Sequence, residues 1–166
     1  MHTSRLIHRL LAAGAVGTLA VALSGCVSFT APSTVERDEE SQEVVEGGNA
    51  DVFAIAVGDC FTEVTETEIN QLPVVPCGES HDYEVFHLFD MPDGEWPGAE
   101  AVDAAAEEGC LSAFEPFVGI SYEESVFIAD SIDPSEQSWG DGDREIICIL
   151  SDPSGPTEGS AEGTAR

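Results

Sequence analysis

The chain contains no lysine, and its only basic side chains that are always charged are five arginines. Against them stand 33 aspartates and glutamates, which give a net charge of −28 at pH 7. Such a surface repels phosphate backbones and anionic lipid headgroups, so we expect no nucleic-acid partner and no electrostatic attachment to a membrane. Acidic partners are disfavoured for the same reason, whereas cations, basic proteins and an ion-rich cell wall are compatible neighbours.

The sequence also lacks an apolar run of the roughly 20 residues that a membrane-spanning helix requires. Its longest mostly apolar stretch covers residues 10–23, follows Arg5 and Arg9, and leads through Ser-Gly into Cys26. A basic start, a short apolar core and small residues before a cysteine are the features of a lipoprotein signal with its lipobox. We predict that residues 1–25 are a signal peptide and that Cys26 receives the lipid, on the extracytoplasmic face of the cell membrane.

Two alternatives stay open for this segment: an ordinary cleaved signal followed by a chance cysteine, and a retained transmembrane helix. The glycines and alanines in the run, and the lack of a positive cluster after it, argue against the helix. Without residues 1–25, three arginines stand against 33 acids, a net charge of −30. The acyl chain on Cys26 would therefore supply the membrane attachment that the charge opposes.

No two cysteines have the close spacing of a structural zinc site, so the sequence predicts no metal centre. Apart from Cys26, the cysteines form an even set of four in an exported protein, which indicates two disulfides. The four are Cys60, Cys77, Cys110 and Cys148.

Composition divides the rest of the chain into three parts. Residues 26–50 join the lipidated cysteine to an acidic segment without apolar periodicity, and we expect a flexible tether. Residues 152–166 are rich in proline, glycine, serine, threonine and glutamate, and we expect a disordered tail. Residues 51–151 are left for one small domain, to which two disulfides would add about 2–4 kcal/mol each.

Hydrophobic periodicity predicts one long helix and five strands in this domain. The helix covers residues 99–115, where apolar side chains recur every three or four positions. This order of elements predicts an α+β fold, with a small antiparallel or mixed sheet of about five strands packed by one main helix. The expected strands cover residues 52–57, 72–75, 83–89, 125–129 and 144–150.

The strand at 83–89 is apolar on both sides, as a covered central strand is. Strict alternation places Tyr83, Val85 and Phe89 on one face and Phe86 and Leu88 on the other.

The positions of the cysteines on these expected strands and helix also predict how they pair. Cys60 follows the first strand and Cys77 follows the second, so a local bond can join them. Cys110 lies on the apolar face of the helix and Cys148 lies inside the last strand. A bond between these two would pin the helix to the sheet, provided that the Cα atoms come within about 4.4–6.8 Å.

One chemically suggestive group is Ser80-His81-Asp82, which has the residue types of a hydrolase triad. Neighbours on an extended chain point to opposite faces and cannot form a triad. His81 and Asp82 stay candidate binding residues, against the plainer interpretation of a turn histidine bonded to backbone.

The second group precedes the last strand. Asp141-Gly142-Asp143 lacks the EF-hand pattern, and a turn explains it better than a weak calcium site. Arg144 is the only basic side chain in residues 51–151, so we expect an ion pair with Asp59, Asp82 or Asp143. Trp139 is a core or lid aromatic or, alternatively, one that binds a partner. No catalytic residue and no cofactor is indicated; the candidate binding residues are His81, Asp82, Trp139, Asp143 and Arg144.

Taken in order, several short motifs resemble the septum-formation family, a small cysteine-paired domain of actinobacterial membrane and lipid-anchored proteins. The resemblance covers about residues 51–151 and departs at Ser80, where the family commonly has proline. It implies an extracytoplasmic, non-enzymatic role tied to cell division or the cell envelope. The motifs are Gly58-Asp59-Cys60-Phe61, Val75-Pro76-Cys77, His81-Asp82-Tyr83-Glu84-Val85, Cys110, Trp139, Gly142-Asp143-Arg144 and Cys148.

The leading hypothesis is a non-catalytic envelope interaction module, anchored by its lipid and bound to an unknown envelope protein or wall component. A second hypothesis is a cation-binding or sensing lipoprotein that uses Asp141, Asp143, His81 or Asp82. A third is a hydrolase with an unrecognised carboxylate site, which would require a pocket where His81, Asp82 and Arg144 converge.

Overall fold

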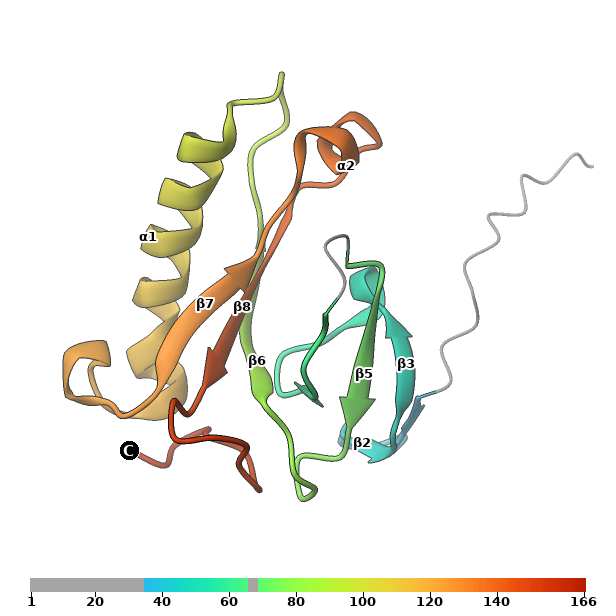
Figure 1. Ribbon diagram of the computed structural model, residues 1–166, viewed down its shortest axis with the longest axis vertical. Coiled ribbons are helices and arrows are strands. Elements are labelled where there is room, and N and C mark those ends of the chain that lie inside the picture. Colours follow the sequence, from blue (N-terminus) through green and yellow to red (C-terminus); the bar gives the residue numbers. More distant parts are fainter. Residues whose placement is uncertain (1–34, 66–68) are drawn as a thin grey trace, which may run out of the picture.

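The computed structural model describes residues 35–65 and 69–166, which form an α+β domain (Figure 1). The predicted signal peptide, Cys26 and the first part of the expected tether lie outside the described residues. In the part of the chain that is described, no helix has both the length and the apolar character needed to cross a bilayer.

Six strands form one antiparallel sheet in the order β3-β5-β4-β6-β8-β7. A separate antiparallel pair joins β1 (Glu36–Arg37) to β2 (Val44–Glu46). The expectation of about five strands was therefore too low, since the first strands are short and carry no clear period. The strands of the large sheet are β3 (Gly48–Asp51), β4 (Cys60–Phe61), β5 (Gln71–Val75), β6 (Tyr83–Asp90), β7 (Ile128–Ile132) and β8 (Glu145–Ser151).

The main helix α1 (Ala99–Val118) covers one face of β6, β7 and β8 (Figure 1). Gly109 lets it approach closely, because a Cβ atom there would lie 2.4 Å from the Phe89 ring. The helix runs three residues past its expected end and holds Pro116 in its last turn, where little of the backbone ladder is lost. It ends at Gly119, whose left-handed conformation (φ 90°) lets its N–H bond to the Glu115 carbonyl.

Three short elements differ from the expectation. The strand expected at 52–57 is instead the 3-10 turn η1 (Val52–Ala54), because the Asp51 carboxylate accepts the Phe53 N–H at 3.0 Å. The strand expected at 125–129 starts later, after the 3-10 turn η2 (Tyr122–Glu124). The helix α2 (Glu136–Gly140) was not predicted; the serines that cap it are described with the site below.

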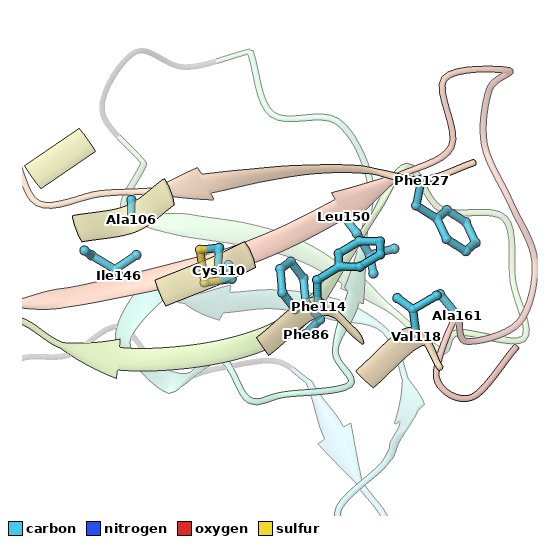
Figure 2. Close-up of a cluster of buried hydrophobic side chains, with 10 residues drawn as sticks. Phe86, Ala106, Cys110, Phe114, Val118, Phe127, Ile146, Leu150 and Ala161 are labelled. Carbon is cyan, nitrogen blue, oxygen red and sulfur yellow. A yellow bond between two sulfur atoms is a disulfide. The ribbon is translucent and has the colours of Figure 1, made fainter. Parts of the chain in front are cut away.

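Two hydrophobic cores lie on opposite faces of the central strands. The core under α1 contains Phe86, Phe114, Ile146 and Leu150 (Figure 2). The other core joins side chains of β3, β4 and β5 to Val85, Ile147 and Ile149. Alternate residues of β8 thus enter different cores, which is why its sequence is apolar from Ile146 to Leu150.

A β-bulge in β6 corrects the expected faces of this strand. Val85 pairs with Ile149 and His87 pairs with Cys148, so Phe86 is one extra residue in the ladder. The extra residue reverses the alternation beyond it. Phe89 therefore packs on the α1 side with Phe86, and Leu88 packs against the core that contains Val85.

Both disulfides have the predicted pairing. Cys60 is bonded to Cys77 with a Cα–Cα distance of 5.2 Å. Cys110 of α1 is bonded to Cys148 of β8 with a Cα–Cα distance of 5.4 Å. The second bond fixes the helix to the sheet inside the core that the helix covers.

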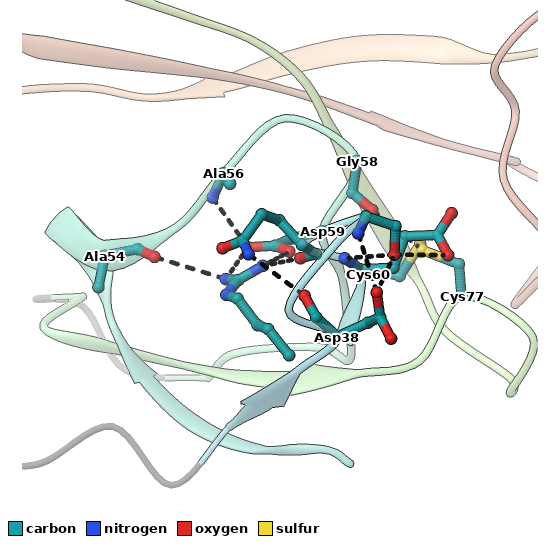
Figure 3. A network of polar contacts seen from close by, with 11 residues as sticks. Asp38, Ala54, Ala56, Gly58, Asp59, Cys60 and Cys77 are labelled. Atoms are coloured by element: carbon teal, nitrogen blue, oxygen red, sulfur yellow. Dashed lines mark hydrogen bonds and ion pairs between the residues drawn. A yellow bond between two sulfur atoms is a disulfide. The ribbon is translucent and has the colours of Figure 1, made fainter. Parts of the chain in front are cut away.

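The described part of the expected tether is not free chain, because Arg37 of β1 binds Asp59 of the domain. The terminal guanidinium nitrogens Nη1 and Nη2 each donate to one carboxylate oxygen at 2.6 Å, and the Ala56 N–H donates to the carboxylate at 2.8 Å (Figure 3). Asp59 is buried, and hydrogen bonding to it raises the pKa of Arg37 above its ordinary value. Beyond β2, β3 joins the edge of the sheet.

The segment expected to be a disordered tail is likewise packed on the domain. Residues 152–166, here called the C-terminal strap, form an isolated β-bridge with His81 and bury Ala161 to 4% exposure. Composition pointed to disorder because the segment has few apolar residues. Backbone hydrogen bonds hold it instead.

We expect Arg37→Ala to lower the free energy of unfolding by about 2–4 kcal/mol, because it leaves the buried Asp59 carboxylate without its counter-charge. Arg37→Lys keeps the charge but loses the two-pronged geometry, so its loss should be smaller. Urea unfolding with the disulfides intact measures both. An Arg37→Ala protein as stable as the wild type would contradict the role given to this pair.

Candidate functional site

The sequence-predicted site residues fall into two groups at opposite ends of β6. His81 and Asp82 precede its first residue, whereas Asp143 and Arg144 precede β8, whose residue Glu145 pairs with Asp90 at the far end of β6. The eight residues of β6 span roughly 25 Å. The pocket that a hydrolase using both groups would need is therefore not formed by these residues.

At the first end, His81 is a buried turn residue rather than an open ligand. Its side-chain Nδ1 lies 2.9 Å from the Glu79 carbonyl oxygen, and its backbone exchanges two hydrogen bonds with Thr157 of the C-terminal strap. The Asp82 carboxylate accepts the Glu63 N–H at 2.9 Å. Both side chains thus hold loops in place, as the plainer interpretation of His81 predicted.

At the other end, Trp139 is buried and makes three contacts within the domain. Its indole N–H donates to the Gly94 carbonyl at 3.0 Å, and its ring meets Trp96 edge to face. The Arg144 guanidinium lies 3.8 Å from the centre of the same ring. The structure thus places Trp139 as a buried aromatic of α2, in line with the core interpretation, and binding of a partner through it stays a prediction.

Arg144 does not have the ion-pair partner that the sequence suggested. Its Nε lies 3.5 Å from an oxygen of the exposed Asp93, and its Nη1 donates to the Trp139 and Asp143 carbonyls. Asp59 is taken by Arg37 instead. An exposed pair of this kind contributes little, so stacking and carbonyl contacts hold the arginine.

Asp143 organises the turn into β8, as expected for a turn. Its carboxylate accepts the Ser138 hydroxyl at 2.8 Å and the Glu145 N–H at 3.0 Å. Ser138 and Ser135 also cap α2 reciprocally, each hydroxyl accepting the other residue's N–H. These bonds place the start of β8 beside α2.

Between η1 and α2 the surface is hollowed into a groove with a cavity volume of 670 Å³. A shallower hollow of 480 Å³ continues from it across four shared residues, Phe53, Asp141, Asp143 and Glu145. We call the two together the acidic groove. Its other charged lining residues are Asp90, Asp93, Asp133 and Arg144.

Negative charge is crowded along the acidic groove. Asp90 and Glu145 are directly opposite each other on β6 and β8, a placement that destabilises a sheet. Burial raises the pKa of Glu145, and the charges of Asp90 and Asp143 raise it further. Arg144 is the only basic residue among the described residues that line the groove.

Two further features of the groove are an aromatic edge and an unsatisfied acid. Phe53, at 63% exposure, stands at the edge of both hollows. The Oδ1 atom of Asp133 is buried and has no hydrogen-bond partner in the described chain. Burial raises the pKa of this carboxyl, and the charges of Asp103 and Asp130 add to the effect. The groove thus offers an apolar edge and several carboxylates without counter-charges.

Sequence reasoning missed most of these groove residues. Asp90, Asp133 and Glu145 carry no local motif in a chain with 33 acids, and they meet only through the register of the sheet. Phe53 was assigned to a strand. The one sequence signal for a turn was Asp51, a residue type that often caps the start of a helix, two positions before Phe53.

In the described chain, one group of three side chains has ligand atoms spaced for a metal ion. Cys60, Cys77 and Glu84 place these atoms within 4.8 Å of one another. The two sulfurs form a disulfide, and the carboxylate accepts hydrogen bonds from Ser160 and Ala161. No thiolate is free for zinc there, and a metal-free protein remains a prediction.

We expect the domain to become more stable as the pH is lowered from neutral, through the raised pKa values of three carboxyls, to the ordinary carboxyl pKa of about 4. Burial raises the pKa of Glu84, Asp133 and Glu145 in the folded state. The folded state therefore binds these protons more tightly than the unfolded state. Their stabilising effect is complete below the ordinary carboxyl pKa and is lost as the pH rises through the raised values.

Thermal melting across this pH range measures the trend, and Glu145→Gln combined with Asp133→Asn should flatten it. A melting temperature that falls steadily on acidification over the same interval would contradict the assignment.

Comparison with known proteins gives one family. The sequence profile of the Septum formation family matches residues 57–166, about two thirds of the chain. The matched region contains both disulfides, α1, α2 and the C-terminal strap. No curated protein and no solved structure gives a significant match. On the match across most of its length, the chain belongs to the Septum formation family.

Proposed function

We propose that this protein is a lipoprotein on the outer face of the cell membrane and acts as a non-catalytic binding module during septum formation. In this proposal Cys26 carries the lipid and the acidic groove is the binding face. The inferred partner is a positively charged segment of an envelope protein or a wall component. The observation that carries the proposal is the Asp90–Glu145 pair, in which two carboxylates face each other across neighbouring strands.

The domain would be more stable without this pair of like charges. Like charges in direct cross-strand contact cost about 0.2–1 kcal/mol, and replacing either residue by a neutral one would remove that cost. Sites that bind a charged partner commonly retain such a cost, because the partner supplies the missing counter-charge. A cationic group in the groove would interact with Asp90, Asp143 and Glu145 together, and its carbon chain could pack on Phe53.

The non-catalytic part of the proposal is supported by how the reactive residue types are distributed. Histidine and cysteine are missing from the described residues that line the acidic groove. His81 lies at the other end of β6, where it is buried and hydrogen-bonded. The groove can bind through charge and shape, but its described residues include no nucleophile paired with a histidine base.

A second candidate function is the binding of a divalent cation, which the same crowding of Asp90, Asp143 and Glu145 favours. Calcium accepts carboxylate oxygens in flexible numbers, so three side chains and the nearby Asp141 suit its chemistry. His81 and Asp82, which the sequence grouped with this site, lie too far away to take part. Calorimetry with Ca²⁺ on the wild type and on Asp90→Asn/Glu145→Gln distinguishes this candidate from a basic partner.

We expect Asp90→Asn/Glu145→Gln to raise the free energy of unfolding by about 0.5–1 kcal/mol and to abolish partner binding. Glu115→Gln/Glu123→Gln is the matched control, because it removes the same charge from exposed positions outside the groove. The control should keep wild-type binding. Urea unfolding gives the stability.

Crosslinking in cells gives the binding. A photoreactive phenylalanine analogue at Phe53 should crosslink to a basic envelope protein or wall polymer. The analogue at the exposed Leu111 of α1 should not. Equal adducts from both positions, or adducts that persist in the Asp90→Asn/Glu145→Gln background, would rule out the groove as the binding face.

We expect Cys26→Ser to prevent both lipid attachment and signal removal, so that the protein keeps residues 1–25 and carries no diacylglycerol. Gly25→Ala is the control, because it keeps a small residue before the cysteine and should be processed normally. Intact mass of the purified protein measures both outcomes. A wild-type protein whose mature form begins elsewhere, or carries no diacylglycerol on Cys26, would refute the anchor while leaving the groove untouched.

A further inference from the structure

The C-terminal strap crosses the end of the domain that lies opposite the acidic groove. Its backbone bonds to the turn before β6 through Thr157 and His81, and to the disulfide loop, where the Gly159 N–H donates to the Cys77 carbonyl at 2.6 Å. Farther along, it bonds to the end of α1: Gly163 donates to the Phe117 carbonyl and Ala165 to the Val118 carbonyl, both at 2.8 Å.

One buried side chain of the central sheet holds the middle of the strap. Glu84 of β6, at 1% exposure, accepts the Ser160 hydroxyl on one carboxylate oxygen at 2.5 Å. Its other oxygen accepts the Ala161 N–H at 2.7 Å. Hydrogen bonds to a charged acceptor are the stronger kind, and both of these come from the strap.

Below the strap lies a small cavity of 100 Å³ together with apolar residues of the domain. Ala161 packs into the core that contains Val118, Phe127 and Leu150 (Figure 2). The titratable groups that face Glu84 are His81 from the turn before β6 and Glu162 from the strap. Asp82, Glu158 and Arg166 line the same cavity.

Glu84 and the strap therefore depend on each other. With the strap closed, the carboxylate is out of water and the two strap donors replace its hydration. With the strap away, the carboxylate would regain water, so opening carries a smaller penalty than exposure of an ordinary core residue. The strap leaves from the end of β8, and both disulfides join residues that precede it, so opening of the strap breaks no covalent link between α1 and the sheet.

We propose that the C-terminal strap is a separately opening unit latched by Glu84, and that its opening uncovers Val118, Phe127 and Leu150 while the sheet, α1 and both disulfides stay intact. This device is independent of the proposed function of the acidic groove. It gives the domain a second surface, apolar and covered at rest, whose exposure is controlled by the strap.

Hydrogen exchange read by mass spectrometry tests the latch on the full mature chain with its disulfides intact. Glu84→Ala removes both acceptor oxygens, and Ser160→Ala removes one donor. Glu84→Gln can still accept the Ala161 N–H and donate to Ser160, so it is the conservative variant. Glu162→Ala is the matched control, because it removes a strap carboxylate near Glu84 without removing a latch bond.

In Glu84→Ala the amides of Gly159, Ala161, Gly163 and Ala165 should exchange roughly tenfold faster or more, while those of α1, β6 and β8 keep wild-type protection. Ser160→Ala should show a smaller increase in the same amides. Glu84→Gln and Glu162→Ala should resemble the wild type. Binding of an apolar fluorescent dye should rise only in the variants whose strap exchanges faster.

Two results would overturn the proposal. One is wild-type protection of the strap in Glu84→Ala. The other is faster exchange that spreads equally through β6, β8 and α1 in both Glu84→Ala and Ser160→Ala, because the strap would then be an inseparable part of the fold.

Discussion

Because positive charge is scarce in this domain, its buried carboxylates depend largely on uncharged hydrogen-bond donors. Three arginines lie in the described chain, and each has an acidic partner. Arg37 is bound to the buried carboxylate of Asp59 with two hydrogen bonds. Glu84 is satisfied by a hydroxyl and a backbone N–H, and Asp143 by the same two kinds of donor. Asp133 has one carboxylate oxygen without a donor in the described chain, and Asp90 and Glu145 lie opposite each other on neighbouring strands. These three acids line the acidic groove.

The two buried carboxylates Asp59 and Glu84 also explain why segments outside the main sheet are ordered. Both lie beside Cys60: Asp59 precedes it in the chain, and Glu84 pairs with it across β4 and β6. Asp59 binds Arg37 of the β1–β2 hairpin, and Glu84 binds the C-terminal strap that follows β8. The Cys60–Cys77 bond fixes the backbone between them, so the two segments are held from one rigid region of the sheet.

Sequence reasoning succeeded where the signal is local. The period of α1, the apolar run of β8 and the positions of four cysteines were enough for the α+β fold and for both disulfides. It failed where a residue depends on a distant partner. Arg37 and Asp59 are 22 positions apart, and a single extra residue at Phe86 decides which side chains of β6 face which core. The crowding of the groove depends on that same register, so composition alone could not locate it.

If Cys26 carries the lipid, as proposed, the docking of Arg37 on Asp59 limits how far the domain can travel from the membrane. The chain from Cys26 to β1 can extend at most about 35 Å, whereas a chain undocked up to residue 50 could extend about 85 Å. The volume that the domain explores falls with the cube of that reach, roughly tenfold or more. Its effective concentration beside membrane-proximal targets rises by the same factor. In the proposed anchored state, the Arg37–Asp59 pair would thus hold the domain close to the lipid headgroups.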